Sequence, residues 1–165
     1  MKKFIFFLKV LINSKWIFKY PVKKDILVYD GIKNPFKNYF TTKQMNIFYN
    51  RGEEINILIL IQCVMLIKLK PSDYLEKYLQ YSKPKLILTA ANNYGFYKLS
   101  KKHNIKTAFV QMGQKTFCEN DLRSKEVFNK KNKKVFFVDY MFVFNPSTAK
   151  LFNSFVGGKK IVIGS

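Results

Sequence analysis

Short apolar runs alternate with segments of helical pattern along most of the chain, and this alternation restricts the fold more than any other feature. The apolar runs predict buried strands at 25–31, 45–49, 85–90, 106–111, 139–145 and 160–165. Helices are expected at 55–68, from 71 to about 80, from 94 to 102 and from 146 to about 155. The sequence therefore predicts an α/β fold: a parallel sheet of about six strands with helices on both faces, plus an N-terminal amphipathic helix.

The first twenty residues combine an apolar body with basic flanks. Drawn as a helix, they place Lys2, Lys9 and Asn13 on one narrow stripe, with Lys15 and Trp16 at the end. The apolar run is too short to span a bilayer and lacks a small-residue cleavage site, which argues against a signal peptide. The segment 1–20 is therefore expected to be either an in-plane anchor on a membrane surface or a helix packed on the protein's own core.

The segment from Ile55 to Lys68 predicts a long helix that opens at the acidic residues Glu53 and Glu54. Apolar side chains cover nearly its whole circumference, so we expect this helix to be buried. It is too short to cross a membrane comfortably, and Gln62 interrupts it.

The chain carries 30 basic and 10 acidic residues, a formal net charge of +20. Only two of the basic residues are arginines, Arg51 and Arg123. Proteins that read phosphates and base edges favour arginine, and no zinc-finger spacing or recognition-helix pattern occurs, so no specific nucleic-acid partner is expected. The lysine surplus reflects either AT-rich coding or attraction to an anionic membrane surface or a phosphorylated substrate.

The cysteine and histidine content predicts no metal site. Cys63 and Cys118 lie far apart in segments of different kinds, which suggests neither a disulfide framework nor metal ligands. His103 is the only histidine and falls at an expected helix end, where a cationic side chain complements the helix dipole. No glycine-rich dinucleotide motif or P-loop is present, so an ordinary nucleotide-binding site is not expected.

The carboxyl-terminal ends of the predicted strands are rich in amides and glycines. Ligands of open parallel sheets bind at these ends, and six residues there are predicted to bind substrate: Gly31, Asn92, Asn93, Gln111, Gly113 and Asn145. Amides donate and accept hydrogen bonds, as sugar hydroxyls require, and glycine lets the backbone approach a ligand closely. The alternative is that these amides only cap helices and stabilise turns.

Charged residues are scarce near the same strand ends. Asp30 is the only acid there and is the candidate general base, because a carboxylate can take a proton from an acceptor hydroxyl; Asp-Gly is also a common turn dipeptide. Arg51 can bind a phosphate or carboxylate group of the substrate, or pair with Glu53 or Glu54. Asp139 precedes a strand, at the opposite end of the sheet, and is expected to be structural.

The chain resembles the bacterial surface carbohydrate biosynthesis proteins through six motifs in order: ILVYD, NRGEEINI, KPKLILTAANN, FVQMGQ, DYMFVFN and GKKIVIGS. The resemblance spans roughly residues 25–165. It implies a GT-B glycosyltransferase with two Rossmann-like domains, similar in layout to the CDP-glycerol glycerophosphotransferases. The resemblance implies that residues 21–165 match only the amino-terminal, acceptor-binding domain and that the carboxyl-terminal donor domain is absent. Where relatives tend to have Gln-Asn-Gly, this chain has Gln111-Met112-Gly113.

The resemblance implies a role in surface polysaccharide or lipopolysaccharide biosynthesis, in the cytoplasm or peripherally on the inner membrane. The implied partners are a carbohydrate or lipid-linked acceptor, an anionic membrane surface, and a donor-binding domain or partner subunit that brings the nucleotide-activated donor. No cofactor and no metal are expected. Whether the chain is an enzyme by itself stays open. One alternative is a non-catalytic binding module or a truncated fragment that lacks the donor domain, and a basic nucleic-acid-binding protein ranks last.

Overall fold

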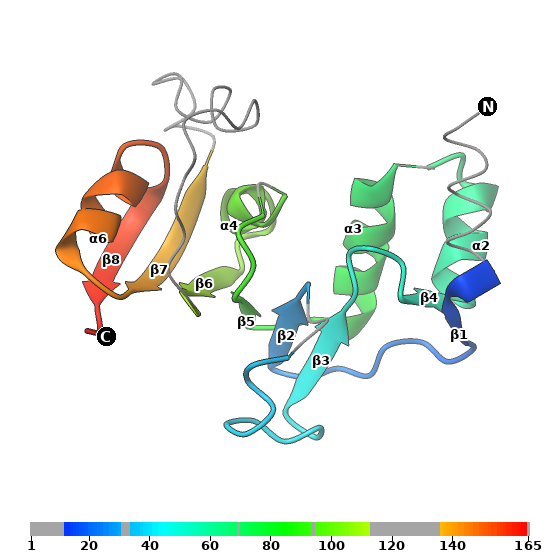
Figure 1. The fold of residues 1–165 in the computed structure, drawn as a ribbon. Coiled ribbons are helices and arrows are strands. Elements are labelled where there is room, and N and C mark those ends of the chain that lie inside the picture. Colours follow the sequence, from blue (N-terminus) through cyan, green and yellow to red (C-terminus); the bar gives the residue numbers. More distant parts are fainter. Residues whose placement is uncertain (1–11, 31–33, 69, 94, 113–135, 165) are drawn as a thin grey trace. The chain divides into compact units, whose positions relative to one another are not determined.

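The computed structural model of the protein describes residues 12–30, 34–68, 70–93, 95–112 and 136–164. The chain divides into two compact units, Met1–Lys85 (the first unit) and Leu86–Ser165 (the second unit). Figure 1 shows the elements of both units, coloured along the sequence. Several predictions fall outside the described residues: those on Gly31, on Gly113, on most of the N-terminal helix and on Cys118 and Arg123.

The first unit contains four strands and two helices among its described residues: β1 (Lys15–Ile17), β2 (Ile26–Tyr29), β3 (Met45–Phe48), β4 (Glu54–Asn56), α2 (Ile57–Met65) and α3 (Pro71–Ser82). The strands β2 and β3 form one parallel pair, and β1 and β4 form another. Leu27, Val28 and Tyr29 of β2 are all buried, as a contiguous apolar strand requires.

The strand β1 corrects the expected N-terminal helix. Of the described residues in that segment, Ile12 and Asn13 are helical, whereas Lys15–Ile17 is extended and pairs in parallel with β4. The prediction of a helical end at Trp16 was therefore wrong, because the backbone there finds hydrogen-bond partners on a distant strand.

The long helix starts later than expected, because Glu54–Asn56 is a strand. Asn56 is the N-cap of α2, and its Oδ1 accepts a hydrogen bond from the backbone N–H of Ile59, 3.2 Å away. A side chain that satisfies an N–H group of the first turn is a strong start signal for a helix. The helix therefore begins at Ile57, and Glu53 and Glu54 lie before it.

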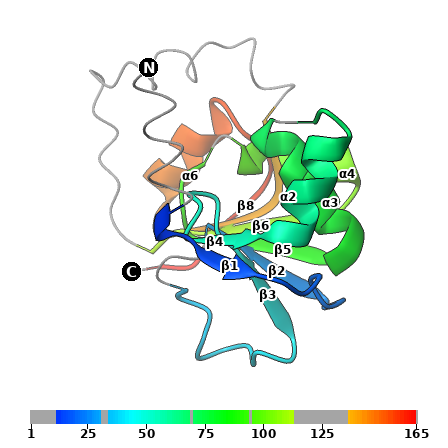
Figure 2. The same ribbon diagram turned by 90° about the vertical axis from the view of Figure 1, so that its right-hand side faces the viewer.

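The expectation that this helix is buried all round was also wrong. Its side chains Ile59 and Cys63 are buried, and α3 lies beside it in both Figure 1 and Figure 2. On the other side, Ile61, Val64 and Met65 are 48%, 56% and 76% exposed. No helix in the described part of the chain is long and apolar enough to cross a membrane.

The described residues of the second unit form four parallel strands and three short helices: β5 (Leu86–Thr89), η1 (Phe96–Lys98), α4 (Leu99–His103), β6 (Lys106–Val110), β7 (Phe137–Val143), α6 (Pro146–Asn153) and β8 (Gly157–Val162). Its strand order is β5-β6-β7-β8. Apart from the β1–β4 pair, the described parallel strands number six: β2 and β3 of the first unit and β5 to β8 of the second. This confirms the predicted α/β class and the number of strands.

The described α-helices of the second unit, α4 and α6, contact the same face of its sheet. Thr107 and Phe109 of β6 point to one side, since side chains two residues apart in a strand share a face. On that side α4 contributes Ser100, which bonds the Asp139 carboxylate beside Thr107, and α6 contributes Phe152, whose ring centroid lies 5.5 Å from that of Phe109. The predicted helices on both faces are therefore not shown by the described residues of this unit.

Candidate functional site

A cleft of about 220 Å³ lies in the first unit, and aromatic side chains dominate its lining. The aromatic residues are Tyr20, Phe48, Tyr49, Tyr74 and Tyr78. They come from the segment after β1, from the end of β3 and from α3. The cleft is smaller than the roughly 300–1,000 Å³ of sites for drug-sized ligands, so it suits a ligand of about one ring.

Polar residues also line the cleft. The polar lining residues are Lys19, Asn46, Glu54 and Asn56. Asn56 is buried and fully used by the fold: its Nδ2 donates to the carbonyl oxygen of Lys19, and its backbone N–H donates to the Tyr74 hydroxyl, both at 2.7 Å. Tyr49 differs from Tyr74, because its hydroxyl makes no hydrogen bond with any described residue, and it can therefore serve a ligand.

The tyrosines of the cleft are neutral hydrogen-bonding groups. Burial, followed by the nearby Glu54 carboxylate, raises the pKa of Tyr49. Burial likewise raises the pKa of Tyr78 far above its ordinary value, and Tyr78 donates to the carbonyl oxygen of Ile47 at 3.3 Å. These phenols stay protonated at neutral pH, so each ring offers an apolar face, and the Tyr49 hydroxyl can both donate to a ligand and accept from it.

Asp30 and Arg51, which the sequence predicts as site residues, are brought together in the first unit. The Arg51 guanidinium lies 3.5 Å from Asp30 Oδ2; the Asp30 side chain is 4% exposed and that of Arg51 is 66% exposed. Asp30 Oδ1 and Glu53 Oε2 are buried and have no hydrogen-bond partner among the described residues. Buried carboxylate oxygens are normally hydrogen-bonded, so the missing partner at Asp30 is a feature that a bound hydroxyl donor would explain.

The Asp30–Arg51 pair adjoins the cleft through the carboxyl end of β3. The backbone N–H of Asp30 donates to the carbonyl oxygen of Phe48 at 2.9 Å, and Phe48 lines the cleft. Tyr49 follows it in the lining, and Arg51 comes two residues later. The ion pair and the aromatic cleft therefore meet where the neighbouring strands β2 and β3 end, although neither Asp30 nor Arg51 is among the residues that line the cleft.

The predicted amides of the second unit engage their oxygens in local structure. Asn145 Oδ1 caps α6 by accepting from the Thr148 N–H at 2.8 Å, and Gln111 Oε1 accepts from the Phe144 N–H at 3.1 Å. Two further amide oxygens have local partners, with Asn92 accepting from Tyr97 and Asn93 accepting from Gly95. The contacts of Asn92, Asn93 and Asn145 are the capping and turn roles that the sequence left open as the alternative, whereas Gln111 links the ends of β6 and β7.

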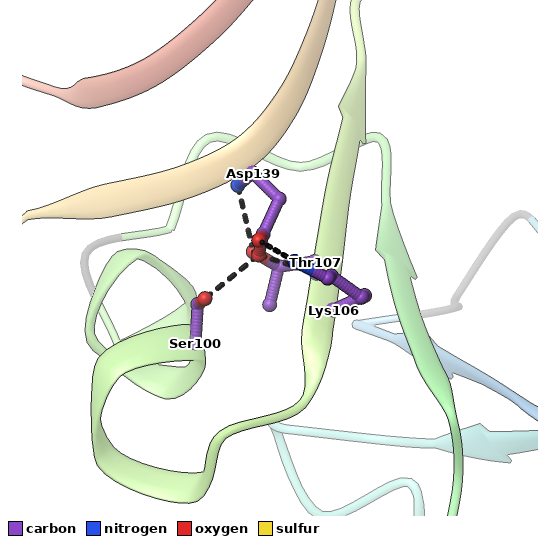
Figure 3. A network of polar contacts seen from close by, with 4 residues as sticks. All are labelled: Ser100, Lys106, Thr107 and Asp139. Atoms are coloured by element: carbon purple, nitrogen blue, oxygen red, sulfur yellow. Dashed lines mark hydrogen bonds and ion pairs between the residues drawn. The ribbon is translucent and has the colours of Figure 1, made fainter.

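Asp139 lies within β7, not before the strand as the sequence predicted, and its carboxylate makes structural contacts (Figure 3). Its Oδ2 accepts from the Ser100 hydroxyl at 2.7 Å and from both the backbone N–H and the hydroxyl of Thr107 at 3.0 Å. Its Oδ1 accepts from Lys106 at 3.1 Å. Burial alone would raise the pKa of this carboxyl, but the bonds from Ser100, Lys106 and Thr107 outweigh it and lower the pKa of Asp139. The carboxylate joins α4, β6 and β7.

Reasoning from the sequence missed the tyrosines that line the cleft. A signal was present, since Tyr74, Tyr78 and Tyr81 recur at spacings of four and three residues and therefore share one face of α3. Tyr81 stacks on Tyr20 with ring centroids 4.3 Å apart, and the Gln62 amide donates to both hydroxyls. The repeated tyrosines on one face of α3 were therefore a signal in the sequence for this site.

Neither similar known proteins nor metal ligands among the described residues indicate a function for this chain. Comparison of the chain with protein-family models, with curated proteins and with solved structures finds no match. Among the residues that the structure describes, no cluster of three or more His, Cys, Asp or Glu side chains could hold a metal ion. The cleft and the ion pair beside it are the features of the described residues that bear on function.

Proposed function

We propose that the first unit binds a saccharide and serves as the acceptor side of a glycosyltransferase-like protein in surface polysaccharide or lipopolysaccharide biosynthesis. The aromatic cleft is the observation that carries this proposal. A sugar ring presents C–H groups on its faces and hydroxyls on its edge. The rings of Tyr49 and Tyr78 can cover the faces, while hydroxyls and the Asn46 amide can bond the edge.

Asp30 has the proposed role of binding, and in a complete enzyme deprotonating, the acceptor hydroxyl. Its buried Oδ1 has no partner among the described residues, and a carboxylate oxygen so placed accepts a hydrogen bond from a hydroxyl donor. Arg51 offsets the negative charge of Asp30 and offers the exposed remainder of its guanidinium to a phosphate of a lipid-linked acceptor. The nucleotide-activated donor would come from a further domain or a partner subunit.

Saccharide titrations followed by protein NMR test the proposal, with two tyrosine variants as a matched pair. The probes are single monosaccharides and their phosphates. Tyr49→Phe removes one hydroxyl from the cleft, whereas Tyr39→Phe removes one from a side chain that is 78% exposed and does not line the cleft. One lost hydrogen bond is worth about 0.5–1.5 kcal/mol, so Tyr49→Phe should weaken binding by roughly 2- to 12-fold.

Two results would contradict the proposal: no shift of the cleft resonances with any saccharide, or equal weakening by both tyrosine variants. The alternative function is a binding module without chemistry. It uses the same cleft, and it is favoured if Asp30→Asn leaves the turnover of a complete assembly, with donor domain or subunit, near normal while saccharide binding persists.

A further inference from the structure

The outward side of α2 is an apolar surface that no described part of the first unit covers. We name it the α2 face: Ile61, Val64, Met65, Leu66 and Ile67, which are 48–86% exposed. Ile61, Val64 and Met65 share one stripe of the helix, because residues three and four apart are neighbours. A surface helix normally turns polar residues outward. In α2 the polar Gln62 instead reaches the tyrosines Tyr20 and Tyr81.

The end of the α2 face carries backbone strain. Ile67 has φ of 54°, in the left-handed region, and its side chain is the most exposed of the five at 86%. This conformation is a genuine outlier for a β-branched residue and costs roughly 1–2 kcal/mol. Glycine or asparagine would end the helix at lower cost. The protein instead presents an isoleucine to the surroundings, which points to a use for that side chain outside the fold.

Lysines lie near both ends of the α2 face, and the first acidic residue after it in the sequence is Asp73, in the first turn of α3. No acidic residue occurs in the sequence from Ile57 to Ser72, and Lys68 and Lys70 follow the face directly and are exposed. Near the other end of the helix, Lys19 is exposed, and its carbonyl oxygen is bonded to Asn56, the N-cap of α2. An apolar centre with a lysine border complements a bilayer that contains anionic lipid, where each lysine near the surface adds about 1 kcal/mol.

We propose that the α2 face inserts into the interface of an anionic membrane, with Lys68 and Lys70 on the lipid headgroups. This placement deepens the proposed function, since it locates the lipid contact of a unit that receives a lipid-linked acceptor. It is independent of the aromatic cleft, because none of the five side chains lines that cleft. Insertion also explains why a helix that is apolar except for Gln62 is buried by the protein on one side only.

Co-sedimentation of the full chain with vesicles of phosphatidylcholine, with and without phosphatidylglycerol, tests the proposal. Met65→Glu places a charge in the α2 face, and Tyr39→Glu adds the same charge at a side chain of equal exposure elsewhere in the first unit, 76% against 78%. We expect strong binding only to the anionic vesicles. Met65→Glu should weaken it at least about tenfold, because the variant loses the burial of one apolar side chain and gains a repelled charge. Tyr39→Glu should change it far less.

A third variant excludes loss of folding as the cause. Ile67→Asn relieves the left-handed isoleucine, so it should raise the melting temperature and still weaken vesicle binding.

Absence of wild-type binding, or equal effects of Met65→Glu and Tyr39→Glu, overturns the proposal. The proposal is also overturned if the wild type binds no vesicles and forms a dimer that Met65→Glu dissociates. A second copy of the chain would then cover the α2 face. Vesicle binding that Met65→Glu leaves unchanged also overturns it and assigns the lipid contact to residues 1–20. Saccharide titration of Met65→Glu is a separate readout, so failure of one proposal is distinguishable from failure of the other.

Discussion

The guanidinium of Arg51 lies 3.5 Å from the carboxylate of Asp30, so a mostly exposed cation is paired with a buried anion at the end of β2. Asp30 also has φ of 60°, in the left-handed region. Its second carboxylate oxygen has no partner among the described residues. The left-handed backbone and the unpartnered oxygen each cost folding free energy, which is the pattern of a side chain retained for binding rather than for stability.

Replacing this carboxylate should therefore not harm the fold. Asp30→Asn removes a buried charge and places a residue that tolerates the left-handed region well, so we expect the free energy of unfolding in urea to rise by up to about 1 kcal/mol. The control is Asp25→Asn, because Asp25 forms an exposed pair with Lys85 at 2.9 Å and should change stability by less than about 0.5 kcal/mol. A loss of stability in Asp30→Asn would instead make the carboxylate a structural group.

The Asp139 network should make the second unit sensitive to acid. The folded-state pKa of Asp139 lies below its ordinary value, so its stabilisation is fully present above the unfolded-state pKa of about 3.9 and is lost as pH falls through the lower folded value. Asp139→Asn should cost about 1.5–3 kcal/mol at neutral pH, the range for hydrogen bonds to a charged group.

Urea unfolding of the wild type and of Asp139→Asn across pH measures this contribution. The difference in free energy between the two proteins should be constant from about pH 5 upward and should shrink below about pH 4. Thr107→Val is a second probe, since it removes the hydroxyl that donates to Asp139 Oδ2 and accepts from the Asp139 N–H. A difference that stays unchanged down to pH 2 would show that the ionised carboxylate does not carry the effect.

The two asparagine caps should differ in their importance. Asn56 is 4% exposed and joins the start of α2 to the segment after β1, whereas the bond that Asn145 makes at the start of α6 is exposed. Asn56→Ala should cost about 2–4 kcal/mol, because it loses a cap and leaves the Lys19 carbonyl oxygen without its donor. Asn145→Ala should cost about 1 kcal/mol. Thermal and urea unfolding measure both, and equal losses would contradict the central role of Asn56.

Two glycines provide a matched test of steric crowding. Gly158 has φ of 100°, and a Cβ there would lie 1.7 Å from the carbonyl oxygen of Val138, where the β7–β8 register shifts. Gly164 has φ of 77°, but nothing lies within 4 Å of its Cβ position. Gly158→Ala should destabilise the protein by at least about 3 kcal/mol, through clash and strain together, and Gly164→Ala by only about 1 kcal/mol. Similar melting temperatures for the two variants would contradict the close approach of β8 to β7.

The sequence by itself determined where the main strands lie. Runs such as Ile26–Tyr29 and Leu86–Thr89 are contiguous, branched and apolar, which is the signature of strands that are buried on both faces. The sequence also indicated the start of α6, because Asn145 and Pro146 are a cap and a first-turn residue in their preferred places. It identified Asp30 and Arg51 as charged residues near strand ends.

Only the tertiary structure decided the pairing of β1, the residues that form the cleft and the side of α2 that stays exposed. Strand β1 has three residues, too few for a period, and it exists because the distant β4 satisfies its backbone. The cleft joins Tyr20, Tyr49 and Tyr78, which no local pattern links. An apolar helix such as α2 does not specify which of its sides a neighbour will cover. Local periodicity reports the hydrogen bonds and burial of one element, whereas a site and an exposed face arise from the packing of elements far apart in the chain.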